Sequence, residues 1–140
     1  MSKSTEKILE ELKFLDDFNS FYNENKDNMV KCGLKEMLDR LIKEKGLKKS
    51  EIIKNSELSE VYAYQIFSGL RTPTRKKLLC LAIGMGLNFE EIQNLLKSSG
   101  YPYLYSKLAF DSVIIYGICK KLSVMEINEL LFDYDLETLG

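Results

Sequence analysis

The sequence predicts an all-helical protein, and three observations support that fold class. Leu, Ile, Lys and Glu are abundant in the 140 residues, whereas proline occurs only twice. Apolar residues recur at spacings of three and four, which is the periodicity of one helix face. No segment requires the period of two that a half-buried strand shows. A hydrophobic fraction of 45% is sufficient for a packed core, so we expect a folded chain.

The first predicted helix lies within residues 1–30. Its apolar positions form a stripe along one helix face: Ile8, Leu12, Leu15, Phe18 and Tyr22. The polar run 23–28 then indicates a turn. This stripe has two alternative uses, docking onto the chain's own domain or onto another protein, and we favour the first.

Residues 31–100 predict a bundle of five short helices. One helix carries Leu34 and Leu38 and stops at Gly46, where a left-handed residue can end it. Two shorter helices follow, separated by a break near residues 55–57, and the second of them begins at Ser59, a good N-cap. Pro73 is a suitable first residue for the next helix, which runs to Gly86. The fifth helix begins near Asn88.

The C-terminal part of the chain repeats itself. Residues 87–96 match residues 122–131 at an offset of 35, and at the same offset Leu104 is opposite Leu139. Each copy carries a capping-box pattern, Asn88 with Glu91 and later Ser123 with Glu126, followed by an isoleucine and paired leucines. Residues 47–52 are a third, shorter echo. Residues 101–140 therefore predict a helical hairpin packed on the bundle. The aromatic segment 101–105 packs the joint between hairpins or binds a partner, and we favour packing.

Charge is unevenly distributed along the chain. Residues 31–77 carry a net charge of +6, between a net −3 in residues 1–30 and −4 in residues 78–140, although the whole chain carries only −1. A basic segment between acidic ends indicates a surface for an anion, with nucleic acid the leading candidate.

Several function classes have no support in the sequence. Histidine is absent, which removes Ser-His and Cys-His catalysis and the commonest zinc ligand. We therefore expect no enzymatic activity, no catalytic residue, no metal and no cofactor. The polar amino terminus and the lack of a long apolar run predict a cytoplasmic protein without a membrane partner. Cys80 and Cys119 lie in apolar stretches, so we expect both to be buried and reduced.

Residues 33–87 resemble the DNA-binding domain of phage-repressor-like regulators, the XRE or lambda-repressor-like family. The run Lys45–Ile53 is similar to the family's second helix with the glycine before it. The run Leu58–Gly69 is similar to the recognition helix with its terminal glycine, and Arg71–Thr74 with the apolar residues up to Leu87 is similar to the fourth helix. The resemblance implies a lambda-repressor-like helix-turn-helix bundle, with an added N-terminal helix and C-terminal hairpin.

The same resemblance implies a sequence-specific transcriptional regulator whose recognition helix, about 59–68, enters the major groove of double-stranded DNA. Leu58, Ala63 and Ile66 are then the buried positions of this helix. The base-reading residues are Glu60, Val61, Tyr64 and Gln65. The phosphate-binding residues are Lys48, Lys49, Ser68, Arg71 and Arg75. A homodimer is expected, because two half-sites are read by a two-fold protein, through either the N-terminal helix or the C-terminal hairpin.

Two glutamates favour an alternative. Glu57 occupies the turn, where the family usually has a small residue, and both Glu57 and Glu60 stand close to where DNA would lie. A carboxylate near phosphate weakens binding. The alternative function is a protein-interaction module on a helix-turn-helix scaffold that does not bind DNA, with a protein partner at the N-terminal helix or the C-terminal hairpin.

Overall fold

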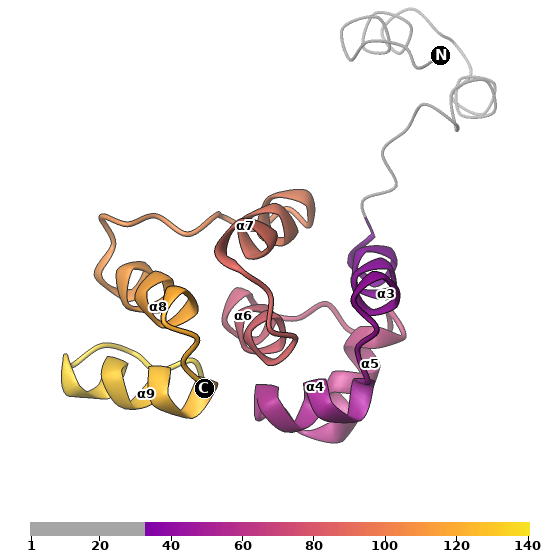
Figure 1. Ribbon diagram of the computed structural model, residues 1–140, viewed down its shortest axis with the longest axis horizontal. Coiled ribbons are helices and arrows are strands. Elements are labelled where there is room, and N and C mark those ends of the chain that lie inside the picture. The colour runs from indigo at the N-terminus through magenta and orange to yellow at the C-terminus, as the bar shows by residue number, and fades with distance from the viewer. Residues whose placement is uncertain (1–32) are drawn as a thin grey trace, which may run out of the picture. The chain divides into compact units, whose positions relative to one another are not determined.

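The computed structural model describes residues 33–140, which contain seven helices and no strand (Figure 1). The predicted all-helical class is confirmed for this part of the chain, and the helix predicted within residues 1–30 lies outside it. The helices are α3 (Leu34–Lys45), α4 (Lys49–Ser56), α5 (Glu60–Phe67), α6 (Arg75–Gly84), α7 (Phe89–Ser98), α8 (Ala109–Cys119) and α9 (Val124–Asp133). None of the helices in residues 33–140 combines the length and apolarity that a membrane span requires.

Local sequence signals account for the ends of the first three helices. Gly46 ends α3 with φ 62°, a left-handed conformation that glycine adopts without steric cost. Residues 57–59 join α4 to α5, and Glu57 is itself left-handed with φ 61°. The Ser59 side chain caps α5 by accepting a hydrogen bond from the Tyr62 N–H. Leu58, Ala63 and Ile66 are buried as predicted, so the inner face of α5 is fixed by apolar packing.

The start of α6 differs from the prediction. Pro73 does not open the helix, because Thr74 is the N-cap and its hydroxyl accepts the Lys77 N–H. Pro73 is instead buried, and its carbonyl accepts a hydrogen bond from the Tyr101 hydroxyl. The proline therefore belongs to the loop that connects α5 to α6.

Helix α6 packs very closely against α4. A Cβ added to Gly84 would lie 2.7 Å from the Ser56 nitrogen and 2.8 Å from the Ile52 carbonyl oxygen. Only a residue without a side chain permits this approach of two backbones. Gly84 is thus needed for close helix packing, and α6 becomes the central support of the bundle.

The sequence repeat is also a structural repeat. Asn88 with Glu91 and Ser123 with Glu126 both form complete capping boxes, at the starts of α7 and α9. On each of these helices an amide side chain binds the backbone of a leucine that lies beyond the helix. Gln93 Oε1 accepts the Leu104 N–H at 2.7 Å, and Asn128 Oδ1 accepts the Leu139 N–H at 2.7 Å. We call α6–α7 with its tail the first hairpin, and α8–α9 with its tail the second hairpin.

The two hairpins face each other with the same side. Helix α6 contacts α9 and α7 contacts α8, which is the pairing that a local two-fold relation between hairpins produces. Individual contacts follow this two-fold relation as well. Arg75 pairs with Asp111, and Lys76 lies 5.5 Å from the Phe110 ring centroid. At the repeat offset of 35, Arg75 corresponds to Phe110 and Lys76 to Asp111, so the two-fold relation maps one contact onto the other.

The two cysteines of the described helices differ. Cys80 is buried on α6, as predicted, and burial raises the pKa of its thiol from 9.0 to about 11. Cys119 is exposed, so the prediction of its burial is wrong. It is the last residue of α8 and stands at the repeat position of Gly84, and no other helix of residues 33–140 encloses its side chain.

Candidate nucleic-acid interface

The four predicted base-reading residues lie together on the outer face of α5. Because the opposite face carries Ala63 and Ile66, their spacing directs these side chains away from the core. Val61 is 70% exposed and Tyr64 is 43% exposed. With Ser68 they line a shallow groove of about 550 Å³, whose walls are Glu60, Val61, Tyr64, Gln65 and Ser68.

Gln65 and Arg71 form one polar unit beside this groove. Arg71 Nε donates a hydrogen bond of 2.7 Å to Gln65 Oε1, and the guanidinium lies 5.4 Å from the centroid of the Tyr62 ring. The Gln65 backbone carbonyl also accepts hydrogen bonds from the backbone N–H groups of Leu70 and Arg71, at 2.9 and 3.1 Å. The loop after α5 is therefore folded back on the helix, and it holds the Arg71 cation next to a predicted reading residue.

Lys48 and Lys49 supply positive charge on the other side, at the start of α4. Both are exposed, and Lys48 is the N-cap residue without a side-chain capping bond. The Lys49 ammonium lies 5.4 Å from the centroid of the Phe67 ring on α5. This cation–π contact brings Lys49 next to the C-terminal end of α5, so cations flank the helix from two separate elements.

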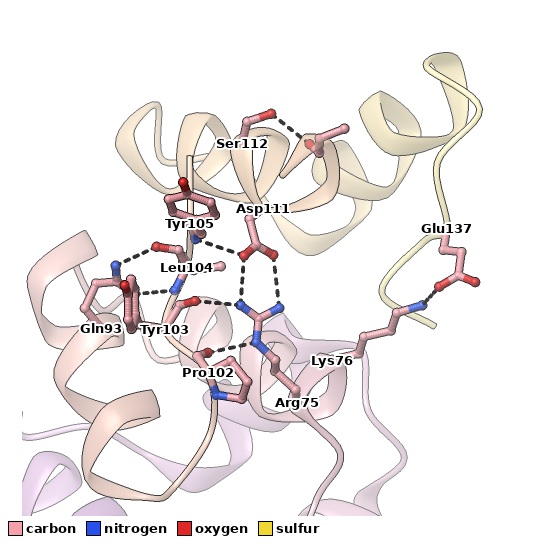
Figure 2. Close-up of polar contacts among 11 residues, drawn as sticks. Arg75, Lys76, Gln93, Pro102, Tyr103, Leu104, Tyr105, Asp111, Ser112 and Glu137 are labelled. Carbon is pink, nitrogen blue, oxygen red and sulfur yellow. Dashed lines mark hydrogen bonds and ion pairs between the residues drawn. The ribbon is translucent and has the colours of Figure 1, made fainter. Parts of the chain in front are cut away.

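Arg75 does not belong to this group, and its assignment as a phosphate ligand is corrected. Its guanidinium donates to both carboxylate oxygens of Asp111 at 3.0 Å, and also to the carbonyl oxygens of Pro102 and Tyr103 at 2.9 and 3.2 Å (Figure 2). Asp111 is buried with 2% side-chain exposure. An arginine with four of its five N–H donors engaged inside the protein is a structural residue that joins the two hairpins.

Sequence reasoning missed one cation near the groove. The aliphatic part of Lys35, on α3, lies against Gly69, and both residues line a recess with Ser68 and Arg71. The Lys35 ammonium pairs with Asp39 at 2.9 Å, which raises its pKa through the hydrogen bond and the charge of that carboxylate. No local motif signals this proximity, because α3 and the loop after α5 are distant in sequence.

The two glutamates occupy different surroundings. Glu60 lines the α5 groove, whereas Glu57 lines a second groove of about 560 Å³ together with Lys48, Lys54 and Lys121. Only one of the two carboxylates therefore shares the groove of the predicted reading residues, and the other lines a groove of mixed charge that also contains Glu51 and Glu126.

No family model, curated protein or solved structure matches the chain. Its function is therefore inferred from its own residues. Within residues 33–140 no three His, Cys, Asp or Glu side chains gather as metal ligands do. The α5 groove itself presents apolar, aromatic, amide, hydroxyl and carboxylate groups, and the cations Lys49 and Arg71 lie beside it.

Proposed function

We propose that this protein is a sequence-specific DNA-binding transcriptional regulator, in which α4, the turn 57–59 and α5 form a helix-turn-helix of the lambda-repressor-like type. One observation carries the proposal. The exposed face of α5 presents Val61, Tyr64 and Gln65 between cations from two other elements, Lys49 before it and Arg71 after it.

The chemistry of this face suits a major groove. An α-helix fits the groove, which is about 12 Å wide, and reads base edges with its exposed side chains. Val61 suits the methyl group of thymine, Gln65 suits adenine, and Glu60 can accept from the cytosine amino group. In the proposed complex Lys48, Lys49, Ser68 and Arg71 bind phosphates, which fixes the position of the helix without specifying sequence.

Arg71 has a second use in the proposed complex. Its Nε is occupied by Gln65, but the outer edge of the guanidinium retains N–H groups that suit either a phosphate or the O6 and N7 atoms of guanine. The Gln65–Arg71 unit then reads or anchors DNA as a pair, because the position of each side chain depends on the other.

The exposed Val61 and Tyr64 also favour a second candidate function, a protein-interaction module that uses the same face. An apolar patch with Glu60 at its edge fits a partner protein as well as a thymine methyl group. The two functions differ in their response to salt, since counterion release makes DNA binding steeply salt-dependent.

Selection of bound sequences from a random duplex pool at near-physiological salt tests the proposal. Enrichment of a palindrome with half-sites about one helical turn, 34–36 Å, apart supports it. A Val61→Glu variant whose fold is verified by circular dichroism should lose that enrichment, because it places a carboxylate on the helix face that meets the polyanionic DNA. An Asn94→Ala variant is the control, since Asn94 is exposed on α7. Failure to bind duplex DNA even at low salt would reject the proposal and favour the interaction module.

A further inference from the structure

The loop that carries Arg71, residues 69–74, is exposed along most of its length. Leu70 is 77% exposed and Arg71 is also exposed, whereas Pro73 is buried. At its start the loop is held by α5, because the Gln65 backbone carbonyl accepts the N–H groups of Leu70 and Arg71. Since these two bonds fix only one end of the loop, the position of Arg71 also depends on what holds the loop at Pro73.

The Tyr101 hydroxyl holds this second end. It donates a hydrogen bond to the Pro73 carbonyl, from a residue that lies 28 positions later in the chain. In the described part of the chain, this is the one hydrogen bond that ties residues 69–74 to a segment other than α5 and α6. A carbonyl that is withdrawn from water and loses its partner costs free energy, so the conformation that buries Pro73 depends on this hydroxyl.

Tyr62 of α5 lies next to both ends of this arrangement. The Arg71 guanidinium is 5.4 Å from the centroid of the Tyr62 ring. Burial raises the pKa of the Tyr101 hydroxyl, and the nearby Tyr62 phenol raises that pKa further, so Tyr101 keeps the proton that it donates. One aromatic side chain therefore borders both the Gln65–Arg71 unit and the Tyr101–Pro73 hydrogen bond.

The segment that follows this tyrosine belongs to the joint between the two hairpins. The Arg75 guanidinium donates to the carbonyl oxygens of Pro102 and Tyr103 (Figure 2). Asp111 of α8 binds the same guanidinium with both carboxylate oxygens. The start of α6 is therefore held against the segment that joins α7 to α8, and the loop before α6 is held there by Tyr101.

The sequence repeat shows that a hairpin can be built without this hydroxyl. At the offset of 35, Tyr101 corresponds to Leu136, and each donates its backbone N–H to the carbonyl of a leucine five residues earlier, at 2.8 and 2.9 Å. Both side chains are half-buried against the core. Pro73 corresponds to Leu108, which is 55% exposed. Of the two hairpins, only the one whose preceding loop carries Arg71 has the hydroxyl, and hairpin packing does not require it.

We propose that Tyr101 is a positioning residue for DNA recognition, whose hydroxyl fixes the loop after α5 so that Arg71 and Gln65 meet DNA as a preformed unit. This inference rests on the proposed function of the α5 face. A side chain that is ordered before binding loses less conformational entropy in the complex, which strengthens binding. The joint between the hairpins then contributes to DNA recognition through Tyr101, although it lies outside the α5 face.

Tyr101→Phe tests the inference, because it keeps the ring that packs on the core and removes the hydroxyl alone. In the free protein, NMR should show faster solvent exchange of the Arg71 Nε–H and of the Leu70 and Arg71 backbone N–H groups. The expected factor is about fivefold, which corresponds to the loss of one hydrogen bond. Fluorescence anisotropy should show a similar fall in affinity for a selected duplex. In an Arg71→Ala background, the same change should leave DNA affinity unaltered.

Tyr103→Phe is the matched control. Tyr103 is 59% exposed, and its hydroxyl forms no hydrogen bond with any group of residues 33–140. Its contact with Arg75 uses the backbone carbonyl, which phenylalanine keeps. This variant should therefore match the wild type in amide exchange and in DNA affinity, and circular dichroism of all variants reports folding.

Unchanged exchange at Arg71 in the Tyr101→Phe variant would overturn the inference, whatever the protein binds. A loss of DNA affinity that persists in the Arg71→Ala background would do the same, because the hydroxyl would then act by another route. A wild-type chain that binds no duplex DNA even at low salt rejects the proposed function, and with it a role of Tyr101 in DNA recognition. The exchange measurement on the free protein does not depend on DNA, so the two failures are distinguishable.

Discussion

The guanidinium of Arg71 and the side-chain amide of Gln65 are joined by a hydrogen bond of 2.7 Å from Nε to Oε1. The bond connects a residue of α5 to the loop that follows the helix. Both residues are predicted to contact DNA, and the Arg71 guanidinium also lies 5.4 Å from the centroid of the Tyr62 ring. We expect each side chain to lose part of its positioning when the other is removed.

We predict that Arg71→Ala and Gln65→Ala have non-additive effects on DNA affinity. Each single change should weaken binding to a selected site, Gln65→Ala by about 1–3 kcal/mol. The coupling in a double-mutant cycle should exceed about 0.5 kcal/mol, as for residues in contact. Fluorescence anisotropy over a salt series gives these values. Strictly additive losses would show that the pair does not act as a unit on DNA.

Lys49→Ala should weaken binding to specific and random duplexes equally. The lysine is predicted to bind phosphate, so its removal should reduce the slope of log K against log salt by about one. Lys97→Ala, at an exposed position on α7, is the charge-matched control and should leave the slope unchanged. A Lys49 variant that changes sequence preference instead would assign the residue to base reading.

Arg75→Ala should destabilise the fold strongly. Removal of one partner leaves the buried Asp111 carboxylate uncompensated, at a cost of about 3–5 kcal/mol. Urea unfolding measures the loss. Lys76→Ala, which breaks an exposed ion pair with Glu137 and the cation–π contact with Phe110, is the control, and its expected loss is only about 1 kcal/mol. If the two variants unfold at the same urea concentration, the Arg75–Asp111 pair does not hold the hairpins together.

Gly84→Ala should also lower the stability of the fold, although the same substitution usually stabilises a helix. Alanine is favoured over glycine by about 1 kcal/mol in a helix interior. Its Cβ would, however, meet the α4 backbone at 2.7 to 2.9 Å, and overpacking of this kind costs about 1–3 kcal/mol. We expect a net loss in urea unfolding. Cys119→Ala, at the matching and exposed position of the repeat, should be close to neutral.

The Cys80 thiol should make stability fall at high pH. Burial raises its pKa from 9.0 to about 11 in the folded protein, so the unfolded chain loses this proton first as the pH rises. The stabilisation is complete below pH 9.0 and is lost as the pH approaches about 11. Unfolding of wild type and Cys80→Ala below pH 9.0 and near pH 11 isolates the effect from that of other titrating groups. A constant difference between the two proteins would contradict it.

Much of the fold was predictable because its signals are local. Ser59, Asn88 and Ser123 cap helices through hydrogen bonds that span three residues, and Gly46 ends α3 by its own left-handed backbone. The repeat predicted the second hairpin because each copy carries its own capping box and helix face. These features require only neighbours in sequence, which the sequence displays directly.

What the sequence did not reveal depends on distant partners. The sequence predicted Arg75 to be a surface cation, but its guanidinium binds Asp111, which lies 36 residues later in the chain. Cys119 lies in an apolar run, but among the described residues no neighbouring helix covers its end of α8. Lys35 contacts the loop after α5 only because α3 packs there. Charge and hydropathy patterns show whether a residue is charged or apolar, whereas tertiary packing determines which residue it contacts.

The paired tails that Gln93 and Asn128 hold have a kinetic consequence. Each amide binds a backbone group 11 residues further along the chain, and each capping box spans three residues, so the second helix and the tail of either hairpin are held by short-range contacts. Short loops close quickly and at low entropic cost, which favours fast folding. We expect the first hairpin to form on the ribosome while the second is still being synthesised, and Asp111 then to dock on Arg75 as the step that locks the two together.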